Sequence, residues 1–363
     1  MNTEILKIIE GGLKRDRSKV IKFARLLSKN LKNTENKSLS KRIDKLLNSN
    51  PGTSFVTADS LSPIPVDSES RLGVIDVTYP SEEQESLIFN SSVNRQLQNF
   101  IDGIKQKEKI IKYGVDVQNS LLLYGPPGCG KTSAAIYIAN ELNLPIVTTR
   151  LDSMVSSLLG STAKNIKKVF SYANDKPCIL FLDEFDAIAK ARDDSHELGE
   201  LKRVVNSLLQ NIDEFIGNNA LIAATNHHEL LDRAVWRRFS ETIFIGLPGV
   251  DRIKELIVLY LKEYPNEISN DLKKTSALAE LLRDSTPSDI KNLCSIAIKN
   301  NLVNGREFLT YPEFLYEIFC LRENKRYSIE KVVEFLSSNC VSQMAIHQLM
   351  ELPIRKVRKI LID

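Results

Sequence analysis

A short stretch at residues 120–136, SLLLYGPPGCGKTSAAI, places glycines, prolines and a lysine between an apolar run and a run of good helix formers. It matches the pattern G-x-x-x-x-G-K-[ST]. Because glycines lack Cβ atoms, the backbone N–H groups of Gly128 through Thr132 can curl around a polyphosphate, toward which the following helix turns its positive end. Lys131 adds a charge for the β and γ phosphates, and the Thr132 hydroxyl can ligate Mg²⁺. The predicted nucleotide-binding residues here are Gly125, Pro126, Pro127, Gly128, Cys129, Gly130, Lys131, Thr132 and Ser133.

An apolar run that ends in two acids supplies the second element of this chemistry. In CILFLDEFDAIA, residues 179–182 predict a buried strand that delivers Asp183 and Glu184 at its end. We expect Asp183 to hold Mg²⁺ through water, so Asp183 joins the nucleotide-binding residues, and Thr132 and Asp183 form the predicted metal site. We expect Glu184 to accept a proton from the attacking water.

Further polar groups follow the next apolar run. ALIAATN ends in Asn226, whose side chain can hydrogen-bond the γ phosphate or the attacking water. LLDRAVWRRF then carries the adjacent guanidiniums of Arg237 and Arg238 on an expected helix end. Phosphoryl transfer spreads negative charge over the transferred group, and an arginine supplied in trans stabilises it. The predicted catalytic residues are therefore Glu184, Asn226, Arg237 and Arg238. A turn residue and a solvated arginine pair are the alternative interpretations.

The elements that must position these residues are short apolar runs alternating with helical stretches. The runs lie at 120–124, 145–149, 178–183, 220–225 and 241–246. They predict an α/β fold with a parallel five-stranded sheet that helices cover on both faces. The ligand site of such a sheet lies at the carboxyl ends of its strands. From about residue 251 to the end, the pattern is helical and contains no strand signal.

The N-terminal region has a different pattern. Residues 1–48 predict a small helical domain, and residues 49–85, rich in Ser, Pro and Asp, predict a linker or an extended segment. The first 50 residues contain 13 Lys and Arg against 5 Asp and Glu. This basic surface fits either a docking module for a partner or an ordinary solvated face.

The overall composition excludes several classes of protein. The 363 residues, 42% hydrophobic and 26% charged with a net charge of +3, are ordinary for a globular protein of two or three units. No apolar run approaches the roughly 18 residues of a spanning helix, and the N-terminus carries charges where a signal peptide needs an apolar core. We therefore expect a cytoplasmic protein without a membrane partner. The five scattered cysteines and four histidines predict neither a disulfide framework nor a zinc site.

Taken together, these motifs resemble those of the AAA+ ATPases. The loop at 125–132, the acids at 183–184, Asn226 and the arginines at 237–238 occur in that family's order and spacing, and ELKRVVNSLLQNID resembles its second region of homology. LDRAVWRRF looks most like the spastin- and katanin-related (meiotic) group of the AAA clade, and stand-alone bacterial AAA ATPases are also similar. The resemblance covers residues 86–320.

The resemblance implies an enzyme that binds ATP with Mg²⁺ and hydrolyses it. It implies a P-loop NTPase core at 86–250 and an α-helical lid at 251–322. It also implies a homo-oligomeric ring, usually a hexamer. In such a ring each nucleotide lies between subunits, and the arginines of one subunit face the γ phosphate of the next.

Two further segments match the family only in part. Leu158, Leu159 and Gly160 occupy the place of a pore loop that grips polypeptide, but the family's aromatic residue is missing, and a buried helix end is the alternative. In DSTPSDIKNL the segment 286–288 aligns with a place where other clades carry a sensor arginine, and it supplies none. This departure agrees with the AAA clade proper and argues against clamp loaders and replication initiators.

The C-terminal extension at 323–363 has the apolar spacing of a helix-turn-helix. Glu351 stands where such motifs prefer a turn glycine, and a two-helix ending of the lid would give the same pattern. The cations of the expected recognition helix are Arg355, Lys356, Arg358 and Lys359.

The sequence favours an ATPase that remodels or unfolds protein substrates as a ring. One alternative is an ATP-gated regulator of a separate effector, such as a protease in bacterial or phage defence. Another is a DNA-associated ATPase that uses the C-terminal helices. The intact Asp183-Glu184 pair argues against a scaffold that only binds ATP.

Overall fold

The computed structural model describes most of the chain beyond residue 74. The described residues are 7, 23–24, 26–28, 75–81, 87–115, 119–151, 159–187, 198–215, 219–323 and 328–362, without the side chains of 159–162 and 198–203. The chain separates into two units, residues 1–63 and 64–363, and the architecture below is that of the second unit. The predicted N-terminal helical domain lies almost wholly outside the described residues, and the few that are described there are helical.

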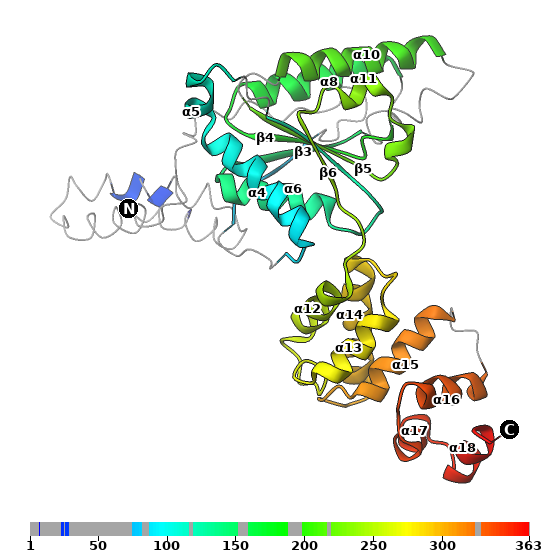
Figure 1. Ribbon diagram of the computed structural model, residues 1–363. Helices are drawn as coiled ribbons and strands as arrows, with labels where there is room; N and C mark the ends of the chain where they lie inside the picture. The colour runs from blue at the N-terminus through cyan, green and yellow to red at the C-terminus, as the bar shows by residue number, and fades with distance from the viewer. Residues whose placement is uncertain are drawn as a thin grey trace. The chain divides into compact units, whose positions relative to one another are not determined.

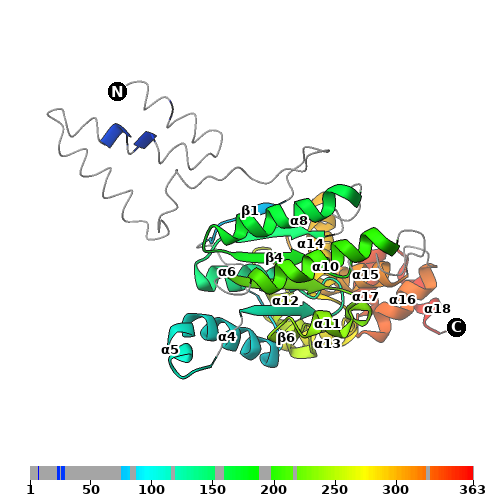
Figure 2. The same cartoon turned by 90° about the horizontal axis from the view of Figure 1, so that it is seen from above.

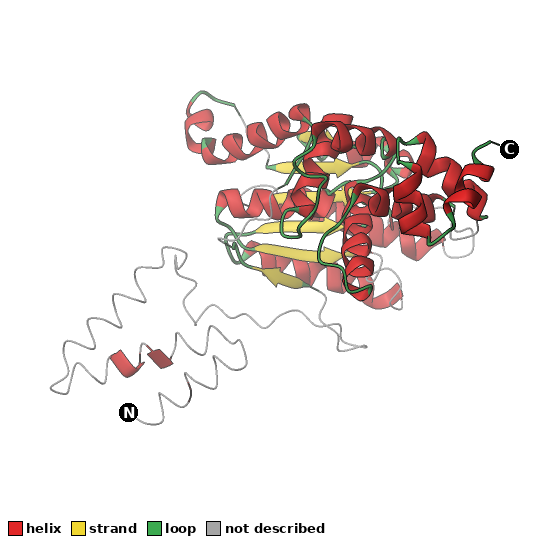
Figure 3. Ribbon diagram, turned by 90° about the horizontal axis from the view of Figure 1, so that it is seen from below, coloured by secondary structure: helices red, strands yellow, loops and turns green. Residues whose placement is uncertain are grey.

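A six-stranded sheet lies at the centre of the predicted core (Figure 3). Its strand order is β1-β3-β4-β5-β2-β6, and all neighbours except β1 and β3 run parallel. The strands are β1 (Asp76–Thr78), β2 (Ser120–Tyr124), β3 (Ile146–Arg150), β4 (Ile179–Asp183), β5 (Ala220–Thr225) and β6 (Glu241–Phe244).

The five predicted strands are all present, and the structure adds β1. This strand lies inside the stretch that the sequence predicts as a linker, and it pairs antiparallel with β3, with Val77 opposite Val147. It is three residues long, which is too short to show an alternating pattern. The sheet is therefore six-stranded with one antiparallel edge, and not the purely parallel five-stranded sheet that was expected.

Alternating side chains let two helical layers cover the sheet (Figures 1 and 2). Along β2, Leu121 and Leu123 belong to one core cluster, whereas Leu122 belongs to the opposite one. The first cluster contains residues of α4 (Ser91–Lys105) and α6 (Lys131–Leu142), and the second contains residues of α8 (Leu159–Asn174), α10 (Leu198–Phe215) and α11 (Arg233–Trp236). Both faces of β2, β4 and β5 are thus buried, which explains why these strands read as continuous apolar runs.

The remaining helices form a second core. After α5 (Lys107–Lys112) and the sheet, the described chain continues as α12 (Val250–Leu261), α13 (Leu272–Leu281), α14 (Pro287–Val303), α15 (Tyr311–Arg322), α16 (Ile329–Ser338), α17 (Gln343–Met350) and α18 (Ile354–Ile360). Leu256 of α12 and Phe314 of α15 belong to the same buried cluster as Ile346 of α17 and Val357 of α18. The predicted lid and C-terminal extension therefore share one hydrophobic core. No helix in the described part of the chain is long and apolar enough to cross a membrane.

Candidate active site

The strand order brings the predicted polar residues to one edge of the sheet. Strand β5 lies between β4 and β2, with Tyr124 opposite Thr225 and Leu182 opposite Ala223. Because these strands are parallel, their carboxyl ends meet. The phosphate loop after β2, the acids at the end of β4 and Asn226 after β5 are consequently neighbours.

The phosphate loop has a backbone that requires glycine. Gly125 has a φ of 141°, and a Cβ placed on it would lie 2.2 Å from the carbonyl oxygen of Ile245. Gly128 and Gly130 have φ values of 75° and 96°, in the left-handed region that side chains disfavour. The glycines thus let the chain turn sharply against the end of β6 and enter α6 directly.

The N-terminus of α6 is suited to bind an anion. Its N-cap is Gly130, no side chain caps it, and its first turn contains no acidic residue. The first-turn N–H groups and the positive end of the helix dipole are therefore available to phosphate oxygens. The Lys131 ammonium donates to the carbonyl oxygens of Gly125 and Pro126, at 2.8 Å each. Burial lowers the pKa of Lys131, so a phosphate that compensates its charge is favoured.

The two predicted metal ligands lie together. The Thr132 hydroxyl donates to Oδ2 of Asp183 over 3.1 Å, and the backbone N–H of Glu184 donates to Oδ1 over 2.9 Å. Within the described ranges, no three His, Cys, Asp or Glu side chains group as a metal site. Hydroxyl and carboxylate oxygens suit Mg²⁺, which retains water and is commonly shared with substrate phosphates. The Thr132 and Asp183 pair therefore fits Mg²⁺ that arrives with a nucleotide.

Glu184 is held by a residue that the sequence reasoning missed. Its φ of 55° is unusual for a residue other than glycine. Its Oε1 lies 2.9 Å from Nη2 of Arg150, the last residue of β3. In the sheet register Arg150 is opposite Asp183, so the pairing of β3 with β4 brings this guanidinium to the acids. An attacking water must compete with Arg150 for the Glu184 carboxylate.

Asp186, which was not predicted from the sequence, positions the backbone of Asn226. Asp186 is only 4% exposed, and its Oδ1 accepts hydrogen bonds from the Thr225 hydroxyl over 3.2 Å and from the Asn226 N–H over 3.3 Å. A buried carboxylate between two strand ends fixes where the backbone turns after β5. The sequence feature that could have pointed to Asp186 is its position in the acidic run DEFD, two residues after Glu184.

The two candidate arginines have different surroundings. Arg238 donates to both oxygens of Asp213, over 2.9 and 3.0 Å, and to the carbonyl of Ala234. Arg237 follows α11, is exposed, and its guanidinium has no partner within the described part of the chain. Arg238 is thus engaged inside its own subunit, whereas Arg237 is available to a group from outside.

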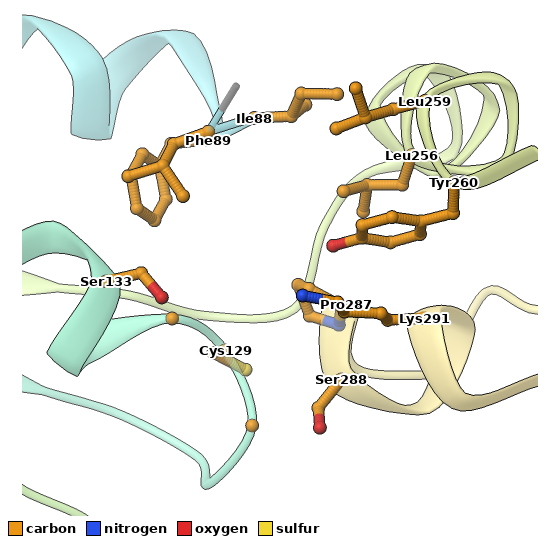
Figure 4. A pocket seen from close by; sticks show the side chains of 13 residues that line it. Ile88, Phe89, Cys129, Ser133, Leu256, Leu259, Tyr260, Pro287, Ser288 and Lys291 are labelled. Carbon is orange, nitrogen blue, oxygen red and sulfur yellow. The ribbon is translucent and has the colours of Figure 1, made fainter. Parts of the chain in front are cut away.

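A cavity of about 460 Å³ adjoins the phosphate loop, between the core and the lid (Figure 4). On the core side Ile88 and Phe89 point into it, and on the lid side Leu259 and Tyr260 of α12 face them. This apolar lining next to an anion site suits a planar base joined to a polyphosphate. The lining residues are Leu87, Ile88, Phe89, Gly128, Cys129, Gly130, Ser133, Leu256, Leu259, Tyr260, Pro287, Ser288 and Lys291.

The cavity side chains from α12 and α14 and from residues 87–89 were not predicted from sequence. They come from three segments far apart in the chain, and the sequence pattern of each segment alone is that of residues in a hydrophobic core. Cys129, which was predicted, is 2% exposed, and burial raises the pKa of its thiol. The thiol therefore stays neutral at neutral pH and adds no negative charge beside the phosphates.

The lid contacts the phosphate loop directly. The backbone N–H of Ser288, in the first turn of α14, donates to the carbonyl oxygen of Gly128 over 3.2 Å. A Cβ on Gly128 would lie 2.8 Å from Oγ1 of Thr286. Thr286 and Asp289 form a capping box that fixes the start of the helix. The segment without a sensor arginine thus meets the loop through its backbone.

The pore-loop prediction lies largely beyond the described residues. Leu158 is not described, and Leu159 and Gly160 begin α8 without described side chains. Whether this segment grips polypeptide stays a prediction.

A glycine-rich loop with a lysine at the carboxyl end of a parallel sheet, next to a Thr hydroxyl bonded to an Asp carboxylate and an adjacent acid, defines a P-loop nucleoside triphosphatase. A family model described as "ATPase family associated with various cellular activities (AAA)" matches residues 121–247. An "Uncharacterized AAA family ATPase y4kL" from Sinorhizobium fredii is 35% identical over 279 residues, which are 77% of this chain and 83% of that protein.

Two relatives with more specific names are also similar. A proteasome-activating nucleotidase from Methanococcus vannielii is 33% identical over 69% of this chain and 64% of its own length. An ATP-dependent zinc metalloprotease FtsH from Parabacteroides distasonis is 31% identical over 62% of this chain, but only 34% of that protein is covered. The chain belongs to the AAA family of ATPases, and ATP hydrolysis is its enzymatic activity. Its assignment to the meiotic group stays a prediction.

Proposed function

We propose that this ATPase forms a homo-oligomeric ring that binds ATP with Mg²⁺ and uses hydrolysis to remodel or unfold a protein. The observation that carries the proposal is the direct backbone contact between Gly128 of the phosphate loop and Ser288 of the lid. Through it, a change in the phosphates that the loop binds can reach the lid. The names of the two relatives, an ATP-dependent protease and a proteasome activator, support work on proteins.

The residues of one subunit divide the chemistry among them. The loop N–H groups and Lys131 bind the phosphates, and Thr132 and Asp183 would hold Mg²⁺, which supplies charge neutralisation when bound. Glu184 takes the proton of the attacking water once it is free of Arg150, and Asn226 orients that water or the γ phosphate.

The neighbouring subunit completes the site in this proposal. Arg237 is exposed and its guanidinium has no partner in the described part of its own chain, so it can face the γ phosphate bound by the next subunit. Arg238 supports the same segment through Asp213. A hexameric ring in the cytoplasm remains the prediction of the sequence.

A second function is favoured by one comparison. The FtsH relative is named as a protease, but the chain covers only 34% of it. In the described part of this chain no cluster of His, Cys, Asp or Glu suits a metal. A protease partner would therefore contribute its own catalytic site, and the ATPase would gate it.

The Glu184→Gln variant tests the proposal. We expect it to retain ATP binding and to lose turnover by at least about a hundredfold, because the general base is removed. Held in ATP, the variant ring should retain the protein on which it acts, to be identified by pull-down and mass spectrometry. Glu108→Gln, an exposed position in α5, is the matched control.

The captured protein separates the two functions. A folded substrate that the parent unfolds in an ATP-dependent assay supports remodelling, whereas a protease whose activity follows the nucleotide state supports gating. Hydrolysis by Glu184→Gln at near the parental rate contradicts the assignment of the base.

A further inference from the structure

The last two helices have the dimensions of a helix-turn-helix. Helix α17 has eight residues, ends at Met350 and is followed by the three residues 351–353, after which α18 begins. Glu351 takes the left-handed conformation, with a φ of 54°, which is the conformation for which a turn glycine is usually required. The sequence pattern and the backbone thus agree on where the turn lies.

A third helix completes the unit. Helix α16 packs against both α17 and α18, which also pack against each other (Figure 1). Val332 and Leu336 of α16, Ile346 of α17 and Val357 of α18 are fully buried in the common core. Three helices in this order, with the last two joined by a tight turn, match the arrangement in which a DNA-binding protein presents its recognition helix.

The burial of Val357 orients the cations of α18. With 3.6 residues per turn, Arg355 and Lys359 lie on the side of the helix opposite Val357 and are exposed. Arg358 flanks this side, and its Nε donates to Oε1 of Gln343 over 3.4 Å. That bond ties the first residue of α17 to the outer side of α18, so both helices can approach the same phosphate backbone.

One acid of α16, Glu330, lies near α18 and interacts with Lys356. Glu330 of α16 has its pKa lowered by its own backbone and by Ser328, with Lys356 contributing. Lys356 is therefore the cation of α18 that faces this acid, whereas Arg355 and Lys359 lie on the side of the helix opposite Val357. An outward pair of cations one turn apart, on a helix held by a packed core, is left for an external polyanion.

We propose that α17 and α18 bind duplex DNA, with Arg355, Arg358 and Lys359 contacting the phosphates beside the major groove. This goes beyond the proposed work on proteins. A membrane surface is less suitable, since the apolar side of α18 is buried in the core and an interfacial helix needs that side for lipid. The structure assigns shape and charge to this surface and no base preference.

Equilibrium binding by the full chain tests the proposal. A fluorescein-labelled duplex of mixed sequence is titrated with the parent, with Arg355→Ala/Lys359→Ala and with the control Lys273→Ala/Lys299→Ala, over a series of salt concentrations. The control removes two exposed cations elsewhere on the lid. Removing two phosphate contacts should weaken binding at 0.1 M salt by about tenfold or more and lower the slope of log K against log salt by about 2.

The parent and the control should bind alike, and ATP turnover without DNA should be equal in all three proteins. Unchanged affinity and salt slope in Arg355→Ala/Lys359→Ala would overturn the proposal, as would no binding of the duplex by the parent at 50 mM salt. Equal binding of poly-glutamate or of phosphatidylserine vesicles, lost in the same variant, would also overturn it, because any polyanion would then suffice. Binding is read separately from hydrolysis and unfolding, so failure here leaves the proposed function standing.

Discussion

The two walls of the cavity differ in kind. The core wall, formed by the phosphate loop and residues 87–89, adjoins the charged and hydrogen-bonding groups, among them Asp183 and Glu184, at the ends of neighbouring strands. The lid wall is mainly apolar, with Leu256, Leu259 and Tyr260, and it meets the loop through the backbone of Ser288. The proposed chemistry therefore depends on groups at the strand ends, whereas the lid contributes apolar packing and a backbone contact to the loop.

This difference predicts which kinetic parameter each wall controls. Substitutions of the phosphate-binding and acidic residues beside the core wall, or of the arginine from the neighbouring subunit, should lower the rate of the chemical step. Substitutions in the lid wall should weaken nucleotide binding while the step itself remains.

The largest effect is expected from Arg237→Ala. If Arg237 reaches the γ phosphate of the next subunit, its loss should lower kcat by about a hundredfold or more. Mixing this variant with Lys131→Ala should restore part of the activity, because some interfaces then combine an intact loop with an intact arginine. Steady-state ATPase assays on single and mixed preparations measure both.

Arg238→Ala is the matched comparison. It removes the pair with Asp213 inside the subunit, so it should lower the melting temperature by a few degrees and affect kcat less than Arg237→Ala. The reverse order of the two kcat effects would assign the trans contact to Arg238.

An intermediate effect is expected from Tyr260→Ala in the lid wall. Tyr260 faces Phe89 across the cavity, and Lys291 lies 6.0 Å from the centre of its ring. Loss of this contact should raise the Kd for ATP by about tenfold, with kcat within about twofold. Tyr113→Ala, at a tyrosine that is 87% exposed, should leave both unchanged. A fall in kcat without a change in Kd would break the division between the two walls.

The smallest effect is expected from Arg150→Ala. Arg150 and Glu184 form a partly exposed ion pair, and exposed pairs of this kind contribute about 0.2–1 kcal/mol. Releasing the carboxylate should therefore raise basal ATP turnover by about twofold to fivefold. Arg95→Ala, an exposed position on α4, serves as the control. A loss of turnover instead would show that Arg150 supports the chemistry.

The sequence could predict candidate site residues where a single segment carries its own pattern. The loop at 125–132 needs its glycines and its lysine in a fixed local order, and the acids at 183–184 follow a strand that is visible as an apolar run. Arg150, Asp186 and Tyr260 were missed because each acts through a neighbour that is distant in sequence. A single guanidinium at a strand end has no local pattern that distinguishes it from a solvated one.

The fold likewise divides into parts that follow from local sequence patterns and parts that depend on contacts between distant segments. Five strands were predicted because each contains a short apolar run, whereas β1 has only three residues and a single neighbouring strand. The C-terminal turn at Glu351 was expected from spacing, but the sharing of one core by α12 and α18 depends on packing among helices a hundred residues apart.

The sequence by itself determined the phosphate loop, the acidic pair and the alternation of strands and helices, since these depend on interactions within a few residues. The tertiary structure alone decided that Arg238 is engaged and Arg237 is available, that Arg150 holds Glu184, and that α14 meets Gly128. The physical reason is that partners are chosen by distance in space, and the order of strands in the sheet sets that distance.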